Sequence, residues 1–139
     1  MTQGKQLTDR VWHLFENGQL DELASLLEPD CHFKMPGFEL RSSAALVEML
    51  AAYRVAFPDL RHEVKTYVES GDTIAIELEA RGTHTGPMQT PAGTVAATGK
   101  QVVWESCDYV RFRNGKLSSW HVYHDPTPFL TALGLLPKR

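Results

Sequence analysis

RFRNGKL at residues 111–117 contains an Asn-Gly pair between two segments in which polar and apolar residues alternate. Asn-Gly favours the left-handed backbone of a two-residue type I′ turn, and alternation is typical of half-buried β-strands. The sequence therefore predicts a β-hairpin with strands at residues 101–113 and 116–125. If Arg113 pairs with Lys116, every later cross-strand pair follows by counting.

This register predicts which side chains share one face of the hairpin. The opposed pairs are Phe112 with Leu117, Val110 with Ser119, Asp108 with His121, Ser106 with Tyr123, and Trp104 with Asp125. The face is apolar near the turn and polar farther out, as expected of strands that run from a packed core into a cavity. We therefore predict a pocket lined by polar and aromatic side chains, namely Trp104, Ser106, Asp108, His121, Tyr123 and Asp125.

The other face of the hairpin carries the apolar side chains of Val103, Tyr109, Trp120 and Val122. A contiguous apolar patch of this kind is unfavourable in water, so it predicts a homodimer formed through the outer sheet face. The alternative is that the C-terminal segment covers this face within one chain. His124 belongs to the same face and is therefore expected outside the pocket.

The rest of the chain predicts helices first and strands later. Apolar spacing predicts helices at residues 7–15, 20–27 and 44–57, with Ser42 or Ser43 at the start of the third. Residues 31–36 suit a minor edge strand, and residues 62–69 and 72–81 suit a hairpin. Glycines and prolines predict a mobile loop over the pocket at residues 82–99. The apolar tail at residues 128–136 predicts a short helix or turn that caps the mouth of the barrel. The predicted fold class is α+β, with N-terminal helices packed on a curved antiparallel sheet.

Length and composition limit the classes of function. The 139 residues suit one domain, residues 1–139, and the net charge of −3 from dispersed charges argues against nucleic acid as a partner. No apolar run approaches the ~20 residues that span a bilayer, and the polar start at Met1 argues against a secretory signal. We expect a cytoplasmic protein without a membrane partner. Cys31 and Cys107 form no metal-ligand or disulfide pattern.

Asp125 is the candidate general acid/base of the predicted pocket. A carboxylate beside Trp104 and apolar helices loses solvation, which raises its pKa toward neutrality. The alternative is that Asp125 caps the turn that begins at Pro126, because Asp followed by Pro commonly starts a helix. Both interpretations remain open from the local sequence.

Two histidines are further candidates. His121 opposite Asp108 is either an oriented imidazole or a structural cross-strand pair. His84, in GTHTG at residues 82–86, either contacts the ligand at the base of the loop or is a loop histidine that is solvated or held to backbone carbonyls. The chain has no serine nucleophile elbow, phosphate-binding loop or HExxH helix, so a pocket without metal or cofactor is expected.

Three motifs make the chain resemble the SnoaL-like polyketide cyclases of the nuclear transport factor 2-like superfamily. They are FPDLR at residues 57–61, GTHTG at residues 82–86, and RFRNGKL at residues 111–117 followed by Asp125. The resemblance covers most of the chain and implies a cone-shaped fold. The superfamily includes cyclases, isomerases, epoxide hydrolases, dehydratases and binding domains, so the motifs specify the fold more than the activity.

The resemblance also implies a role for Asp125. In the characterised cyclases an aspartate on the last strand is the acid/base of an intramolecular aldol ring closure, without metal or cofactor. We expect a cyclase or isomerase acting on a small hydrophobic carbonyl compound, with Asp125 and His121 as catalytic residues. The expected substrate contacts are Trp104, Ser106, Asp108, Tyr123 and His84. The alternatives are a non-catalytic ligand-binding domain and an epoxide hydrolase or dehydratase.

Overall fold

The structure is a computed structural model and describes residues 3–90 and 93–136. The two ends of the predicted domain, and Pro91 within the predicted loop, lie outside the described residues. The helices are α1 (Gln3–Glu16), α2 (Leu20–Ala24), α3 (Ser43–Ala56) and α4 (Thr127–Ala132). Among the described residues, no helix is long and apolar enough to cross a membrane.

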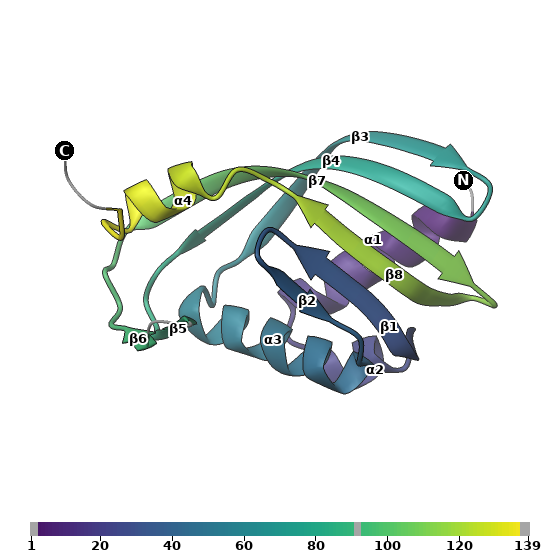
Figure 1. The fold of residues 1–139 in the computed structure, drawn as a ribbon, viewed down its shortest axis with the longest axis horizontal. Coiled ribbons are helices and arrows are strands. Elements are labelled where there is room, and N and C mark those ends of the chain that lie inside the picture. Colours follow the sequence, from purple (N-terminus) through teal and green to yellow (C-terminus); the bar gives the residue numbers. More distant parts are fainter. Residues whose placement is uncertain (1–2, 91–92, 137–139) are drawn as a thin grey trace.

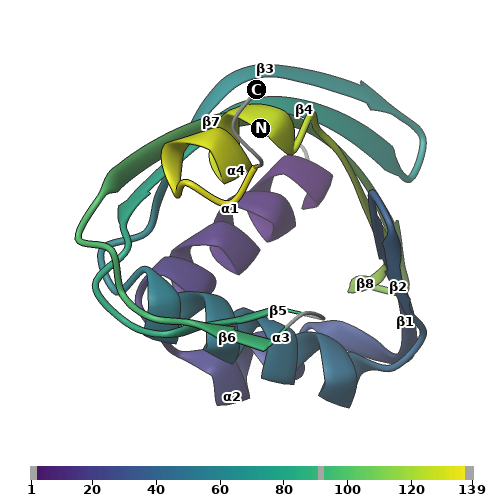
Figure 2. The same cartoon turned by 60° about the vertical axis from the view of Figure 1, so that its left-hand side comes forward.

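A six-stranded curved sheet is the frame of the molecule (Figure 1). Its strands are β1 (Leu27–Met35), β2 (Phe38–Leu40), β3 (Arg61–Ser70), β4 (Thr73–Thr83), β7 (Gln101–Arg113) and β8 (Lys116–Tyr123). They follow the order β2-β1-β8-β7-β4-β3. Helices α1 and α3 lie inside the curve of the sheet (Figure 2). The predicted α+β class, with helices packed on a curved sheet, is confirmed.

Strand β1 is where the predicted sheet was wrong. It begins at Leu27, lies between β2 and β8, and pairs with β8 in parallel, so the sheet is mixed rather than antiparallel. Its pairing with β8 shifts between Leu27 and His32, where Pro29 has no N–H to donate. Pro29 was interpreted as the end of a helix, which hid the first half of the strand.

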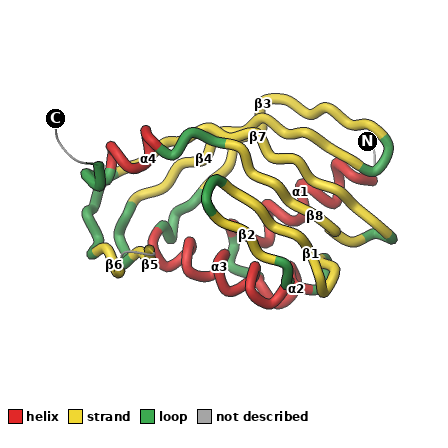
Figure 3. The backbone as a smooth tube through the Cα atoms, in the orientation of Figure 1, coloured by secondary structure: helices red, strands yellow, loops and turns green. Residues whose placement is uncertain are grey.

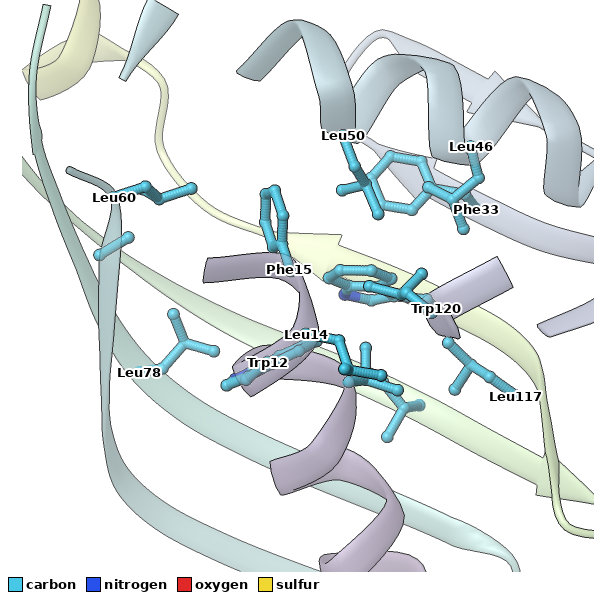
Figure 4. Packing of buried hydrophobic residues seen from close by; sticks show 14 of the residues in the cluster. Trp12, Leu14, Phe15, Phe33, Leu46, Leu50, Leu60, Leu78, Leu117 and Trp120 are labelled. Atoms are coloured by element: carbon cyan, nitrogen blue, oxygen red, sulfur yellow. The ribbon is translucent and has the colours of Figure 1, made fainter. Parts of the chain in front are cut away.

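The first three helices form close to where apolar spacing predicted them, but α2 ends at Ala24 and Leu27 belongs to β1. Gly18, at φ +72°, lies just beyond the end of α1, and the Ser42 side chain accepts a hydrogen bond from Ala45 N at 3.3 Å at the start of α3. Trp12, Leu14 and Phe15 of α1 pack toward the core residues of the sheet (Figure 4). The core therefore joins the helices to the concave face of the sheet.

The predicted loop at residues 82–99 contains a small hairpin, β5 (Met88–Thr90) with β6 (Gly93–Val95), which lies beside the C-terminal end of α3 (Figure 3). The loop is anchored to that helix, because Thr85 N and Gly86 N both donate to Ala56 O, at 3.2 and 3.3 Å. A Cβ atom on Gly86 would lie 1.8 Å from Val55 O, so only glycine fits this approach. The mobility of the loop stays a prediction.

Candidate active site

A cavity of about 70 Å³ lies between the concave face of the sheet and helices α1 and α3. Its wall is largely apolar and includes Phe15, Phe33, Met35, Leu50, Leu60 and Leu78. Its polar groups are Tyr53, His62, Ser106, Asp108 and His124, beside the indoles of Trp104 and Trp120. An apolar wall with a few convergent polar groups suits a small organic ligand.

Asp108 on β7 is the buried acid of this cavity. Its side chain is 4 % exposed, and burial raises its pKa to about 6, although hydrogen bonds from Trp120 and Ser106 and the charge of His62 act in the opposite direction. A carboxyl group with a pKa near neutrality is suited both to accept and to return a proton at physiological pH.

Two donors fix the orientation of the Asp108 carboxylate. Ser106 Oγ donates to Oδ1 at 2.8 Å, and Trp120 Nε1 donates to Oδ2 at 2.9 Å. Each carboxylate oxygen has two lone pairs, so each keeps one for a ligand. Asp108 is therefore held in place while it retains the capacity to take up a proton.

The hairpin turn is as predicted, but the register beyond it is not. Asn114 and Gly115 have φ angles of 54° and 75°, and Arg113 faces Lys116. A β-bulge at Ser118 then adds one residue to β8, so Val110 faces Trp120 and Asp108 faces Val122. The extra residue turns Trp120, Val122 and His124 toward the cavity, and it turns the neighbouring residues outward.

Asp125 does not line the cavity, in contrast to the prediction. Its side chain is exposed, and Oδ1 accepts a hydrogen bond at 2.9 Å from the backbone N–H of Thr127, the first residue of α4. Hydrogen bonds from Thr127 hold the pKa of Asp125 below its usual value. This geometry matches the capping alternative, with the bulge at Ser118 as the reason for the change of face.

His121 and Tyr123 also lie outside the cavity lining. His121 faces Tyr109, and its Nε2 lies 3.0 Å from His32 Nδ1 in a hydrogen bond between the two rings. Burial and the nearby charges of His32 and Lys34 lower the pKa of His121. Tyr123 is 52 % exposed and faces Cys107. The predicted pair of His121 with Asp108 is therefore replaced by Val122 opposite Asp108.

His84 is fully buried and does not line the cavity. Thr98 N donates to His84 Nδ1 at 3.2 Å, which leaves the ring proton on Nε2, and the ring packs against Phe57 at 5.5 Å between centroids. In this position His84 anchors the loop. Of the predicted site residues, the structure brings Trp104, Ser106 and Asp108 together in the cavity.

The bulge also changes the outer face on which the dimer prediction rests. Trp120 is 4 % exposed and Val122 lines the cavity, so neither contributes to an outer apolar patch. Val103 and Tyr109 are exposed there as predicted, and Tyr123, which was predicted in the pocket, is exposed as well. Three large apolar side chains still occupy this face, and the dimer stays a prediction.

Four polar or aromatic groups of the cavity were not predicted as site residues, namely Trp120, His124, His62 and Tyr53. A signal for the first two exists, because the apolar Leu117 and Trp120 are three residues apart, which breaks strict alternation and indicates a bulge. His62 lies two residues after the buried Leu60, a spacing that suits the inner face but indicates no function.

A sequence model of the SnoaL-like polyketide cyclases matches residues 5–133, which span the fold from α1 to α4. The chain belongs to the SnoaL-like polyketide cyclase family. The resemblance inferred from the three motifs is thereby confirmed. No curated protein matches this SnoaL-like chain in sequence.

Several solved structures share the fold. AclR, a hydroxylase candidate from Streptomyces galilaeus, has a TM-score of 0.81 and 28 % identity over 98 % of this chain and 83 % of AclR. IdmH, a polyketide cyclase candidate from Streptomyces antibioticus, has a TM-score of 0.78 and 24 % identity over 96 % and 99 % of the two chains. A SnoaL-like polyketide cyclase candidate from Jannaschia sp. CCS1 has a TM-score of 0.84 and 16 % identity over 97 % and 94 %.

Proposed function

We propose that this SnoaL-like protein catalyses cofactor-independent proton transfer on a small hydrophobic carbonyl compound, with Asp108 as the acid/base. The observation that carries the proposal is the raised pKa of a carboxyl group that is held by two donors inside an apolar cavity. Asp108 thus takes the role that the sequence analysis assigned to Asp125.

The reaction begins when ionised Asp108 removes a proton from a carbon next to a carbonyl group, and the electron pair forms an enolate. In an aldol ring closure the enolate carbon attacks a second carbonyl of the same molecule, and the proton held by Asp108 passes to the new alkoxide. In an isomerisation, Asp108 returns the proton to another carbon of the same enolate. Both reactions share the first step, which a carboxylate achieves only when the carbon acid is activated by conjugation or by a second carbonyl.

The apolar wall supports this choice of substrate. A carbonyl compound without charged groups fits among Phe15, Leu60 and Leu78, and stacks on the indole of Trp104.

The exposed Val103 and Tyr109 support the further proposal of a homodimer through the outer sheet face. A cytoplasmic location is part of the same proposal.

The isomerisation of cyclohex-3-en-1-one to the conjugated ketone tests the shared first step with a substrate of one ring. We expect the protein to accelerate the reaction, because proton removal from the carbon between the carbonyl and the double bond is the slow step. Ultraviolet absorbance of the product gives the rate, and the thermal shift with phenol reports binding separately. Binding of phenol without any acceleration would assign the cavity to a binding domain and contradict the proposal.

A further inference from the structure

A second polar group of the cavity, His62 on β3, has its own carboxylate partner. Glu16, the last residue of α1, accepts the backbone N–H of His62 at 2.7 Å, and the same Oε2 lies 3.1 Å from His62 Nδ1. The side chains of His62 and Glu16 are 11 % and 17 % exposed. The pair is therefore largely enclosed at the junction of α1 and the sheet.

The partner specifies which ring nitrogen carries a proton. Burial acts to raise the pKa of Glu16, but the hydrogen bonds and the charge of His62 together outweigh it and lower the pKa. An ionised carboxylate only accepts hydrogen bonds, so Nδ1 is the donor in this pair. Nε2 has no hydrogen-bond partner among the described residues. It is also not one of the fully buried polar atoms that lack a partner, so part of its surface is accessible.

Packing holds the ring in place. The centroid of the His62 ring lies 5.7 Å from that of Trp12 and 5.6 Å from that of Phe15. His62 lines the same cavity as Asp108, and its charge stabilises the ionised form of Asp108. The imidazole is thus oriented by Glu16 and two aromatic rings, and its Nε2 is available for a further hydrogen bond.

We propose that His62 is the second proton-transfer residue of this site, acting through Nε2, and that Glu16 is its positioning residue. This inference rests on the proposed function of the cavity. Two separate proton-transfer groups suit a substrate in which a proton leaves carbon while another reaches oxygen. The substrate class is therefore an enolisable ketone whose oxygen becomes the hydroxyl of an enol.

The proton balance of the step is complete. The Asp108 carboxylate takes the proton from carbon, the C–H electron pair forms the carbon–carbon double bond of the enol, and the imidazolium of His62 gives its Nε2 proton to the carbonyl oxygen. Asp108 is then protonated and His62 neutral. In an isomerisation both transfers reverse at the second carbon, since His62 takes the enol proton while Asp108 gives its proton to carbon.

Several charged or titratable groups influence this step. The charge of His62 acts to lower the pKa of Glu16 on α1 and of Asp108 on β7. Arg61 precedes His62 in the chain and its charge acts on Glu16, and His124 lines the same cavity from the end of β8. Any pH profile of the reaction reports this group of residues together.

The test compares His62→Gln and Glu16→Gln on cyclohex-3-en-1-one, with His32→Gln as the matched control. His32 has the same kind of partner, with its Nε2 at 2.8 Å from Glu39 Oε1, but it does not line the cavity. We expect kcat to fall about 10²-fold in His62→Gln, with loss of the rate decrease at high pH. Glu16→Gln should lower kcat by roughly 10-fold, as expected for a partner that orients an imidazole. His32→Gln should stay within about twofold of wild type.

A second measurement does not depend on activity. ¹⁵N spectra of protein with labelled histidine rings should place the proton of neutral His62 on Nδ1, and Glu16→Gln should shift the ring toward the Nε2–H form. Phenol, whose hydroxyl mimics an enol, should move the His62 Nε2 signal and leave the His32 signals unchanged. Because these spectra use the wild type and Glu16→Gln, they test the proposal even if His62→Gln fails to fold.

The outcomes separate this inference from the proposed function. Loss of activity in Asp108→Asn together with unchanged kcat and pH profile in folded His62→Gln would overturn the role of His62 alone. An Nε2–H tautomer in wild type would also overturn it, because Glu16 would then not be the acceptor of Nδ1–H. Absence of turnover by the wild type would overturn both.

Discussion

Replacing Asp108 with asparagine should lower the turnover of cyclohex-3-en-1-one by roughly 10²–10⁴-fold, with phenol binding retained. The amide has nearly the same shape as the carboxylate but has no group that takes up a proton. Its oxygen still accepts from Trp120 Nε1, and the Ser106 hydroxyl rotates to accept from its amide nitrogen. Measurement of kcat and of the phenol dissociation constant separates loss of chemistry from loss of the pocket.

Asp125→Asn is the matched control, because it makes the same change on an exposed aspartate outside the cavity lining. The amide oxygen still accepts the N–H of Thr127, so both turnover and melting temperature should be unchanged. A large fall in Asp125→Asn with normal turnover in Asp108→Asn would restore Asp125 as the acid/base and contradict our proposal.

Asp108→Asn should also change how stability depends on pH. Folding raises the pKa of Asp108 from 3.8 to about 6, so the folded protein binds this proton more tightly than the unfolded chain. Stability is therefore lost as pH rises from about 4 to about 6, by about 3 kcal/mol. The asparagine variant lacks this loss and should exceed the wild type in free energy of unfolding at pH 7.

The turnover rate of the wild type should change in the opposite direction and rise with pH through about 6, because the base must be ionised.

Phe57→Ala should destabilise the protein by about 3–5 kcal/mol, as expected for removal of a fully buried phenylalanine. Phe57 is 0 % exposed, and its ring lies 5.7 Å from Trp104 and 5.8 Å from Phe129 between centroids. Its removal leaves a cavity next to Trp104, so the Michaelis constant for cyclohex-3-en-1-one should rise as well. Urea unfolding gives the stability, with unchanged slope as evidence of two-state behaviour.

Phe38→Ala provides the comparison for that variant. Phe38 on β2 is 41 % exposed and makes an edge contact with Phe33 at 6.3 Å between centroids. Its truncation should cost about 1 kcal/mol, because little buried surface is lost. Equal losses in Phe57→Ala and Phe38→Ala would mean that the aromatic cluster around Trp104 does not support this end of the fold.

Local signals explain why much of the fold could be predicted from the sequence. The Asn114-Gly115 turn, the Ser42 cap and the run of strand β7 all depend on residues close in the chain, and the structure has each of them. Because β7 is regular, alternation placed Trp104 and Asp108 on the inner face correctly.

The site itself could be predicted only in part. A single extra residue at Ser118 reversed the faces of β8, so the acid that lines the cavity is Asp108 on β7 rather than Asp125 beyond β8. Glu16 and His62 are 46 positions apart and meet only because the end of α1 packs against the start of β3. No local pattern in the sequence contains that contact.

The carboxyl ¹³C titration of Asp108 tests the central claim most directly, with its signal assigned by comparison with Asp108→Asn. We expect a midpoint near pH 6, because burial outweighs the hydrogen bonds from Trp120 and Ser106. In the same spectra Asp125 should titrate below its usual value of 3.8, because Thr127 stabilises its ionised form. A midpoint at or below 3.8 for Asp108 would contradict its role as a proton-transfer group near neutral pH.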